Sequence, residues 1–259
     1  MESIKQNITS PEQKLLQTFV CDDCHQHVSQ TELIIPSGPR EGERVTANYG
    51  CRCEDIKLAK AAEQKYNQLK HRNLMDRFNY YSLINDSLKE ATFDNFDAPD
   101  TNLKQAKEKA LAYSHSFDRK QNLLLTGDYG TGKSHLSVSI TKALMKQDYE
   151  CLFLSLPKLL TKIKRTYNTK GVTEDELLNV IQHVDLLVLD DIGAEQQTEW
   201  STSKLFEILD NRLGKATVYT TNLSSDELKE RVNERNFSRM MDHTNVIVMN
   251  GSDYRRRGF

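Results

Sequence analysis

Several features are scarce in this sequence, and each scarcity excludes a class of protein. The 259 residues include a single tryptophan, five prolines and five cysteines. No apolar run approaches the roughly 18–20 residues of a membrane span, and the polar start MESIKQNITSPEQK lacks a signal-peptide core. The net charge of −2 gives no overall basicity, so any nucleic-acid site must be local. We therefore expect a cytoplasmic protein with no membrane partner.

The remaining composition suits a globular protein in two parts. Hydrophobic residues make up 37% of the chain and charged residues 28%, which allows both a core and a solvated surface. The length suffices for one α/β domain of typical size plus a smaller appendage. Residues 1–53 hold three prolines and three glycines, whereas no glycine occurs over 51–126. This change in proline and glycine content predicts a domain boundary near residue 53.

The most specific motif is a phosphate-binding loop. Residues 127–134 read GDYGTGKS, which matches G-x-x-x-x-G-K-[ST] at every fixed position, between an apolar run at 122–126 and a helical pattern at 136–145. Backbone N–H groups of such a loop surround phosphates, while Lys133 can reach the β/γ oxygens and Ser134 can ligate Mg²⁺. The predicted nucleotide-binding residues are Gly127, Asp128, Tyr129, Gly130, Thr131, Gly132, Lys133 and Ser134.

A second motif supplies carboxylates. Residues 184–190 are almost continuously apolar, as in a central strand of a parallel sheet, and they end at Asp190 and Asp191. We assign Asp190 to Mg²⁺ and Asp191 to polarising the attacking water. An aspartate reaches less far than a glutamate, so we expect slow hydrolysis. The alternative is that Asp191 only caps the following turn.

Strands and helices alternate after the phosphate loop, which predicts an α/β fold: a central parallel sheet with helices on both faces. Ligands of such sheets bind at the carboxyl ends of the strands. One strand delivers Asn222 there, where its amide could orient water; the alternative is that Asn222 caps the next helix. The predicted elements cover 123–126, 134–147, 151–155, 157–168, 174–183, 184–190, 199–213, 216–220 and 226–234.

The cysteines are unevenly placed. In a reducing compartment, clustered thiolates suit tetrahedral Zn²⁺ better than disulfides, and a small segment needs such a staple. One pair is separated by one residue instead of two, so a histidine ligand (His25 or His27) and a metal-free segment stay open as alternatives. The spacing resembles a zinc ribbon more than an iron–sulfur site. The predicted ligands are Cys21, Cys24, Cys51 and Cys53.

A long helix is predicted to follow the cysteines. Apolar residues recur there at helical spacing among lysines and arginines, whose basic face most often is solvated surface. The chain would then consist of a zinc-binding domain over 1–53, a helical linker over 54–92 and a nucleotide-binding domain over 93–259. The apolar positions are Ile56, Ala59, Ala62, Tyr66 and Leu69.

Several separated stretches resemble the DnaC/DnaI/IstB group of AAA+ ATPases, and the DnaI-type helicase loaders above all. The phosphate loop alone is common to many ATPases, but the segment DDIGAE at 190–195 and the box ending in Ser238 and Arg239 narrow the choice. The stretches are the cysteine-rich start and residues 91–96, 127–134, 189–195, 198–200, 220–223 and 234–239.

This resemblance implies a fold, partners and further site residues. It implies ATP hydrolysis by an AAA+ domain, self-association, and an arginine finger, Arg239, acting on a neighbouring subunit's ATP, with Arg235 a weaker candidate. The alternative for Arg239 is a plain surface position. The chain stops at Phe259, so we expect no full helical lid, and a sensor role for Arg255 stays open.

One segment suits single-stranded DNA. Residues 151–173 contain no acidic side chain but five lysines and arginines, and three of them share a helix face beside a tyrosine. Phosphate attraction with base stacking is the chemistry of sequence-tolerant strand binding, although a solvated helix is the alternative. The family's initiator-type helix occupies this position. The predicted contacts are Lys158, Lys162, Arg165 and Tyr167.

These features together predict an ATP-dependent loader of the replicative, DnaB-type helicase. Residues 1–53 would hold the helicase, and the ATPase domain would deliver it onto single-stranded DNA during replication. The first alternative is an IstB-like transposition ATPase, which the cysteine-rich start disfavours. The second is a bacterial or phage protein that sequesters the helicase with little turnover.

Overall fold

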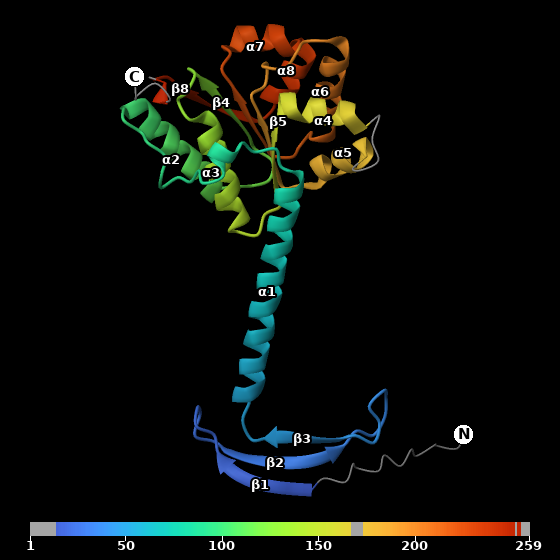
Figure 1. Ribbon diagram of the computed structural model, residues 1–259. Helices are drawn as coiled ribbons and strands as arrows, with labels where there is room; N and C mark the ends of the chain where they lie inside the picture. The colour runs from blue at the N-terminus through green and yellow to red at the C-terminus, as the bar shows by residue number, and fades with distance from the viewer. Residues whose placement is uncertain (1–13, 167–172, 252, 255–259) are drawn as a thin grey trace, which may run out of the picture. The chain divides into compact units, whose positions relative to one another are not determined.

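The computed structural model describes residues 14–166, 173–251, 253 and 254. The chain forms two compact units, Met1–Leu69 and Lys70–Phe259, which meet within the helix α1 (Cys53–Tyr81). Figure 1 colours the first unit blue and the second from cyan to red. The predicted long helix after the cysteines is thereby confirmed, but it ends at Tyr81, so the helical linker expected over 54–92 is helical only in its first part.

The first unit is a three-stranded antiparallel sheet that the sequence did not reveal. Its strands are β1 (Lys14–Val20), β2 (His27–Ile34) and β3 (Arg44–Tyr49), in that order. Every residue of β1 is exposed, so no alternation of buried and exposed positions marks it as a strand. Among the described residues up to Leu69, only Cys21 and Val28 are buried. Such a unit cannot rest on a hydrophobic core.

Helix α1 is anchored to the second unit by its last turns. Leu74 and Phe78 are its buried residues, and Arg77 Nη1 donates to both carboxylate oxygens of Glu150 at 2.8 and 2.9 Å. Nowhere in the described chain is a helix long and apolar enough to cross a membrane.

The second unit is built on a five-stranded parallel sheet, as predicted. The strand order is β5-β6-β7-β4-β8, so the chain returns repeatedly to place the ends of distant segments side by side. The strands are β4 (Asn122–Gly127), β5 (Cys151–Ser155), β6 (Leu186–Asp190), β7 (Thr217–Thr221) and β8 (Thr244–Met249).

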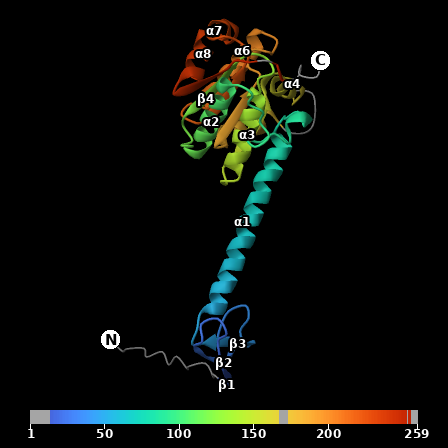
Figure 2. The same ribbon diagram turned by 90° about the vertical axis from the view of Figure 1, so that its left-hand side faces the viewer.

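Helices cover both faces of this sheet because its strands are apolar on both sides. Leu123 and Leu125 of β4 belong to the core beneath α2 and α3, whereas Leu124 belongs to the core beneath the other helices. Figure 1 and Figure 2 show α2 and α3 together on one face. The helices are α2 (Thr101–His115), α3 (Lys133–Met145), α4 (Leu156–Thr166), α5 (Glu174–His183), α6 (Glu199–Asn211), α7 (Ser225–Val232) and α8 (Glu234–Met241), with a 3₁₀ turn η1 (Asp86–Leu88).

Two features of this unit differ from the predicted elements. The helix expected at 226–234 is present as α7, but it ends at Val232, because Asn233 adopts φ of 70° and a separate helix, α8, begins at Glu234. Asparagine adopts positive φ more often than most residues do, and the break is marked by neither a glycine nor a proline. The sequence interpretation also missed β8, which pairs with β4.

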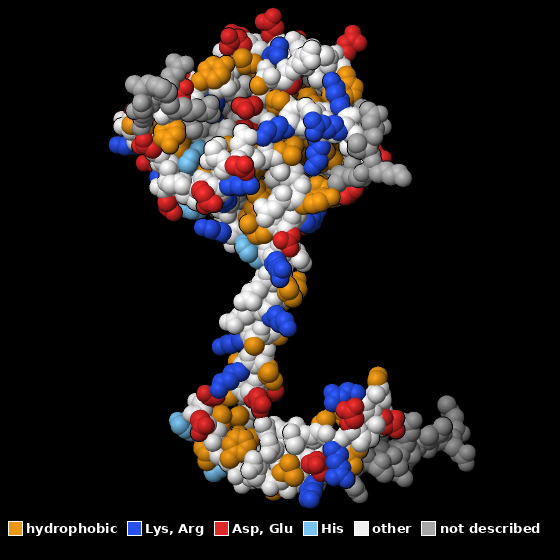
Figure 3. Space-filling view, in the orientation of Figure 1, with side chains coloured by type: hydrophobic (Ala, Val, Ile, Leu, Met, Phe, Trp, Pro, Cys, Tyr) orange, Lys and Arg blue, Asp and Glu red, His pale blue; other side chains and the backbone are white. Residues whose placement is uncertain are grey.

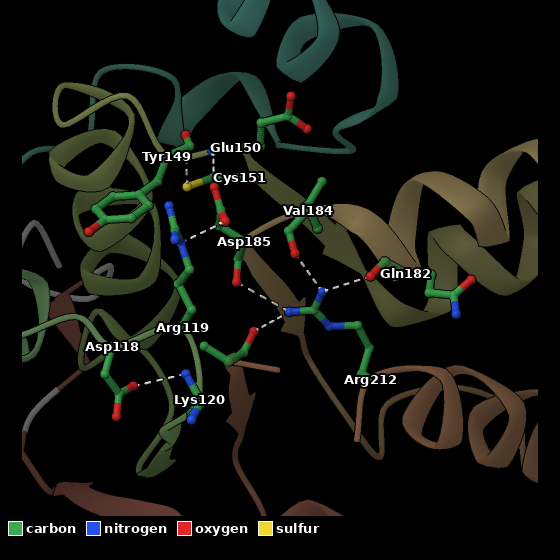
Figure 4. A network of polar contacts seen from close by, with 11 residues as sticks. Asp118, Arg119, Lys120, Tyr149, Glu150, Cys151, Gln182, Val184, Asp185 and Arg212 are labelled. Carbon is green, nitrogen blue, oxygen red and sulfur yellow. Dashed lines mark hydrogen bonds and ion pairs between the residues drawn. The ribbon is translucent and has the colours of Figure 1, made fainter. Parts of the chain in front are cut away.

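A buried arginine ties the amino ends of the strands together (Figure 4). Arg212 is 2% exposed, and its guanidinium donates to the carbonyls of Val184 at 2.6 Å and Ala216 at 2.5 Å. Burial lowers its pKa to about 10. Since these carbonyls lie one or two residues before β6 and β7, the arginine joins the amino ends of both strands, at the edge of the sheet opposite their carboxyl ends.

Candidate nucleotide-binding site

The phosphate loop lies between β4 and α3, and two of its glycines are required by close approach. A Cβ on Gly127, at φ of 129°, would lie 2.3 Å from the Met249 carbonyl oxygen. A Cβ on Gly132, at φ of 91°, would lie 2.5 Å from the Phe96 ring. Both positions combine a backbone conformation that favours glycine with no room for a side chain.

The loop is held on its outer side by the end of β8 and the residues after it. Asp128 N donates to Met249 O at 3.1 Å, and Gly251 N donates to the Asp128 carboxylate at 3.1 Å. Tyr254 N donates to Gly130 O at 3.0 Å. Strand β8 therefore shapes the phosphate loop.

The side chains of Lys133, at the end of the phosphate loop, and Asp190, at the end of β6, interact electrostatically. Lys133 is buried, and its Nζ donates to the carbonyls of Gly127 at 2.9 Å and Asp128 at 2.5 Å. Asp190 is 3% exposed, and burial raises its pKa to about 6, with repulsion from Asp191 adding to the effect. A hydrogen bond from Ser134 opposes this rise, so the two predicted magnesium ligands are in contact.

Thr220 joins the two aspartates, and the sequence interpretation missed its role. Its hydroxyl donates to Asp190 Oδ1 at 2.7 Å and accepts from Asp191 N at 2.9 Å. Asp191 adopts φ of 59°, which directs the chain sharply away from β6. The turn after it is capped by Glu195, whose Oε2 accepts from Gly193 N at 2.8 Å. Glu195 therefore supplies a side-chain cap to this turn.

Asn222 does not cap the next helix, which was the alternative to its role at the nucleotide. The N-cap of α7 is Ser224, whose side chain and that of Glu227 form a capping box. Asn222 instead lines the cavity at the phosphate loop. The carboxyl ends of β4, β6 and β7 therefore bring the predicted loop, aspartates and amide together.

This cavity has a volume of about 940 Å³ and two kinds of wall. One wall is the phosphate loop with Asp190, Asp191 and Asn222. The other combines apolar side chains, which suit the flat face of a base, with polar side chains and the carboxylates Glu90 and Asp97. His135, which the sequence interpretation overlooked, braces this second wall, since its Nε2 lies 2.9 Å from Thr92 O. The apolar lining residues are Leu88, Ala91, Phe96 and Leu103.

A comparison with known protein families also indicates ATP binding. The family described as "IstB-like ATP binding protein" matches residues 60–258. The chain belongs to this family. The matched residues include every residue that lines the nucleotide cavity, and the family's description names ATP binding.

The chain is also similar in sequence to proteins that are named replicative helicase loaders. The "Replicative helicase loader DnaC" of Escherichia coli (strain K12) is 28% identical over 170 residues, 64% of this chain and 69% of that protein. The "Replicative helicase loader DnaI" of Bacillus subtilis (strain 168) is 28% identical over 152 residues, 56% of this chain and 48% of that protein. Solved structures show the same fold. A crystal structure of the DnaC helicase loader superposes with a TM-score of 0.59 at 23% identity, over 64% of this chain and 99% of that one. The structure of AMPPCP-bound DnaA from Aquifex aeolicus superposes with a TM-score of 0.55 at 22% identity, over 62% of this chain and 50% of that one. The fold is thus that of AAA+ proteins.

Residues 234–239, which were predicted to carry an arginine finger, lie on α8, and none of them lines this cavity. Arg239 donates from Nε at 3.2 Å and Nη2 at 2.8 Å to Asp210 Oδ1 on α6. None of the described residues that line the nucleotide cavity is an arginine. Arg255 lies outside the described residues. Within one chain, therefore, the structure does not bring Arg239 to the phosphate loop.

The four predicted cysteine ligands do come together in the first unit. Their Sγ atoms all lie within 4.8 Å of one another, and the cluster found among the described residues includes neither His25 nor His27. Backbone N–H groups, that of Cys24 first, lower the pKa of Cys21 to about 7. In a tetrahedral site with Zn–S bonds of ~2.3 Å the sulfurs stand roughly 3.8 Å apart, so the cluster fits zinc.

The basic helix α4 presents its charges as predicted. Its buried residues form one stripe, and Lys158, Lys162 and Arg165 lie on the opposite side, where Lys158 contacts Asn85. Figure 3 shows Lys and Arg side chains gathered where Figure 1 places α4. Lys164 Nζ lies 4.6 Å from the centroid of the Trp200 ring. Tyr167 lies outside the described residues.

Proposed function

We propose that this protein is an ATP-dependent loader of the replicative DnaB-type helicase onto single-stranded DNA. The observation that carries the proposal is the convergence of the phosphate loop, Asp190, Asp191 and Asn222 in one cavity, in a family whose similar members are named helicase loaders. The cavity supports ATP turnover, and the names of the relatives support the purpose of that turnover.

In this proposal the site binds ATP through fixed donors. Loop N–H groups and Lys133 bind the β- and γ-phosphates, and the apolar wall around Phe96 takes the base. Asp191 accepts a proton from the attacking water, which Asn222 orients. The γ-phosphoryl group passes to this water, and ADP leaves. Because Asp191 has a short side chain, we expect slow turnover.

Magnesium fits the residues between the loop and β6. Asp190 is a buried carboxylate whose pKa is raised by burial and by repulsion from Asp191, and it contacts the Ser134 hydroxyl. Hard oxygen ligands of this kind suit Mg²⁺, which would neutralise charge on the phosphates. Thr220 holds Asp190 in position for this task.

The first unit is proposed as the zinc-stapled contact for the helicase. Four convergent thiols and an almost absent core support the staple. Several large apolar side chains lie exposed on its strands, which is typical of a surface that binds another protein. They are Leu15, Leu16, Phe19, Val20, Ile34 and Tyr49.

The proposed DNA contacts lie on α4 and the proposed arginine finger lies on α8. Lys158, Lys162 and Arg165 of α4 would bind the phosphates of single-stranded DNA, with Tyr167 as the stacking partner. Arg239 would act on the ATP of a neighbouring subunit, which makes self-association part of the proposal. The Asp210 ion pair then has to open when the subunits meet.

Helicase delivery tests the proposal directly. Tagged protein should capture a hexameric helicase from lysate with ATP, and the purified pair should place that helicase onto a closed single-stranded circle. Capture without delivery would favour the sequestering alternative. Capture of a transposase with duplex DNA would favour the IstB-like alternative. Failure to capture either would contradict the loader proposal.

A further inference from the structure

The turn that follows Asp191 has a backbone conformation that depends on its surroundings. Asp191 adopts φ of 59° and Gly193 adopts φ of 92°, and Ala194 N donates to Asp191 O at 3.2 Å. A residue other than glycine persists at positive φ where the contacts around it hold it there. Asp191 and Ala194 both line the nucleotide cavity. The contacts that hold this turn therefore decide where the Asp191 carboxylate lies in the cavity.

An arginine of α7 supplies a charged contact to this turn. Arg231 Nε donates to the carbonyl oxygen of Gly193 at 3.0 Å, and its Nη2 donates to that of Glu195 at 2.5 Å. Hydrogen bonds from a charged donor are stronger than neutral ones, and the planar guanidinium holds two acceptors in a fixed geometry. Arg231 is partly buried and is not among the described residues that line the nucleotide cavity. Its connection to the site therefore runs through the turn.

Further support of the turn comes from the segment that carries Asn222. The Thr221 hydroxyl donates to Ile192 O at 2.7 Å. A Cβ on Gly193 would lie only 2.5 Å from Leu223 Cδ1, so the leucine packs directly against the turn. Asn222 lies between these two supporting residues in the chain. The turn and Asn222 are therefore fixed against each other.

We propose that Arg231 is a positioning residue for ATP hydrolysis, which holds the turn so that the Asp191 carboxylate faces the water that Asn222 orients. The inference rests on the proposed ATPase function and adds to it a residue outside the cavity. Helix α7 begins shortly after Asn222, so the guanidinium links the two groups that act on the water. Positioning of this kind raises the rate of the chemical step. It leaves the affinity for ATP to the phosphate loop, which has contacts of its own.

Turnover of matched α7 variants tests the clamp. Arg231→Met loses the donors but keeps the aliphatic stem, whose Cγ lies 3.4 Å from the place of a Cβ on Gly193. Its kcat should fall at least fivefold, while KM and the affinity for a fluorescent ATP analogue change less than twofold. Arg231→Lys offers one ammonium group to two carbonyls and should have an intermediate kcat. Lys229→Met removes from the same helix a cation that pairs with Glu234 instead, and its kcat should match the parent.

A second substitution, at Asp191, separates positioning from a general defect. Asp191→Asn lacks the proton acceptor, so adding Arg231→Met to it should lower the single-turnover rate of phosphate release by less than twofold. A loss by the same factor in both backgrounds would overturn the inference, because the defect would not act through Asp191. Parental kcat in Arg231→Met would overturn it as well. If Asp191→Asn itself kept the parental kcat, the proposed role of Asp191 would be wrong, and this inference with it.

Discussion

Lys133 is the residue on which nucleotide binding depends most, because it is the single lysine or arginine among the described residues that line the cavity. Lys133→Ala should abolish turnover and weaken ATP affinity at least tenfold. A fluorescent ATP analogue measures the affinity and phosphate release measures the turnover. Lys109→Ala, an exposed lysine on α2, is the matched control. Parental turnover in Lys133→Ala would contradict the site assignment.

Asp190 should make the metal-free protein less stable as the pH rises. Its pKa is raised to about 6, so the folded chain holds the proton more tightly than the unfolded chain does. Stability is then lost between about pH 4 and pH 6, by roughly 2–3 kcal/mol above that range. Asp190→Asn should remove this loss: the variant should be more stable than the parent at pH 7.5 and equal to it near pH 4.

Chemical unfolding in EDTA at the two pH values measures this difference. The same variant should lose magnesium-dependent ATP hydrolysis, since an amide is a poor ligand for Mg²⁺. A parent chain and variant whose stability difference is unchanged between pH 4 and pH 7.5 would show that Asp190 titrates normally.

At the scale of elements, the first unit depends on its cysteine cluster. Purified protein should carry about one zinc per chain by elemental analysis. Cys21→Ser or Cys51→Ser should release it and expose amides of β1–β3 to rapid hydrogen exchange, while the nucleotide unit keeps its protection. Cys151→Ser, in the buried strand β5, should leave the zinc content unchanged. Protein free of both zinc and iron would contradict the staple.

Helix α4 offers a separate test. Lys162→Ala with Arg165→Ala should weaken binding to single strands of any sequence and flatten its salt dependence by up to about 1.4 log–log units, roughly 0.7 per lost contact. ATPase activity without DNA should remain, because neither side chain lines the nucleotide cavity. Unchanged binding in this variant would leave α4 as an ordinary solvated helix.

Elements with a strong local signal could be predicted from the sequence, and others could not. The strands β4 and β6 are apolar on both faces, and the loop between β4 and α3 carries a motif that few other sites share. By contrast, β1 is exposed along its whole length, and the break at Asn233 depends on one backbone angle. Strand β8 alternates buried and exposed valine-rich positions, so its signal was present but unused.

The residues of the candidate site could likewise be predicted only where they belong to a local sequence motif. Residues inside motifs, such as Lys133 and Asp190, could be found from spacing alone. Thr220 and His135 act through contacts between segments far apart in the sequence, which no local pattern records.

At the scale of the whole molecule, the proposed function requires both units in one chain. The Lys162→Ala, Arg165→Ala double variant should still capture helicase, because the capturing surface is placed in residues 1–53, but should not deliver it onto a closed single-stranded circle. Normal delivery by this variant would favour a loader that acts on the helicase alone.

The single tryptophan gives the molecule an optical property of its own. Trp200 lies on α6 with Lys164 of α4 above its ring, and it is not among the residues that line the nucleotide cavity. Ultraviolet emission excited at the indole band therefore originates at one place, beside the basic helix. A phosphate chain drawn to Lys164 would move the ammonium group and change the emission, whereas ATP alone should change it little. If α4 binds single strands as proposed, the unlabelled protein would report their arrival in real time.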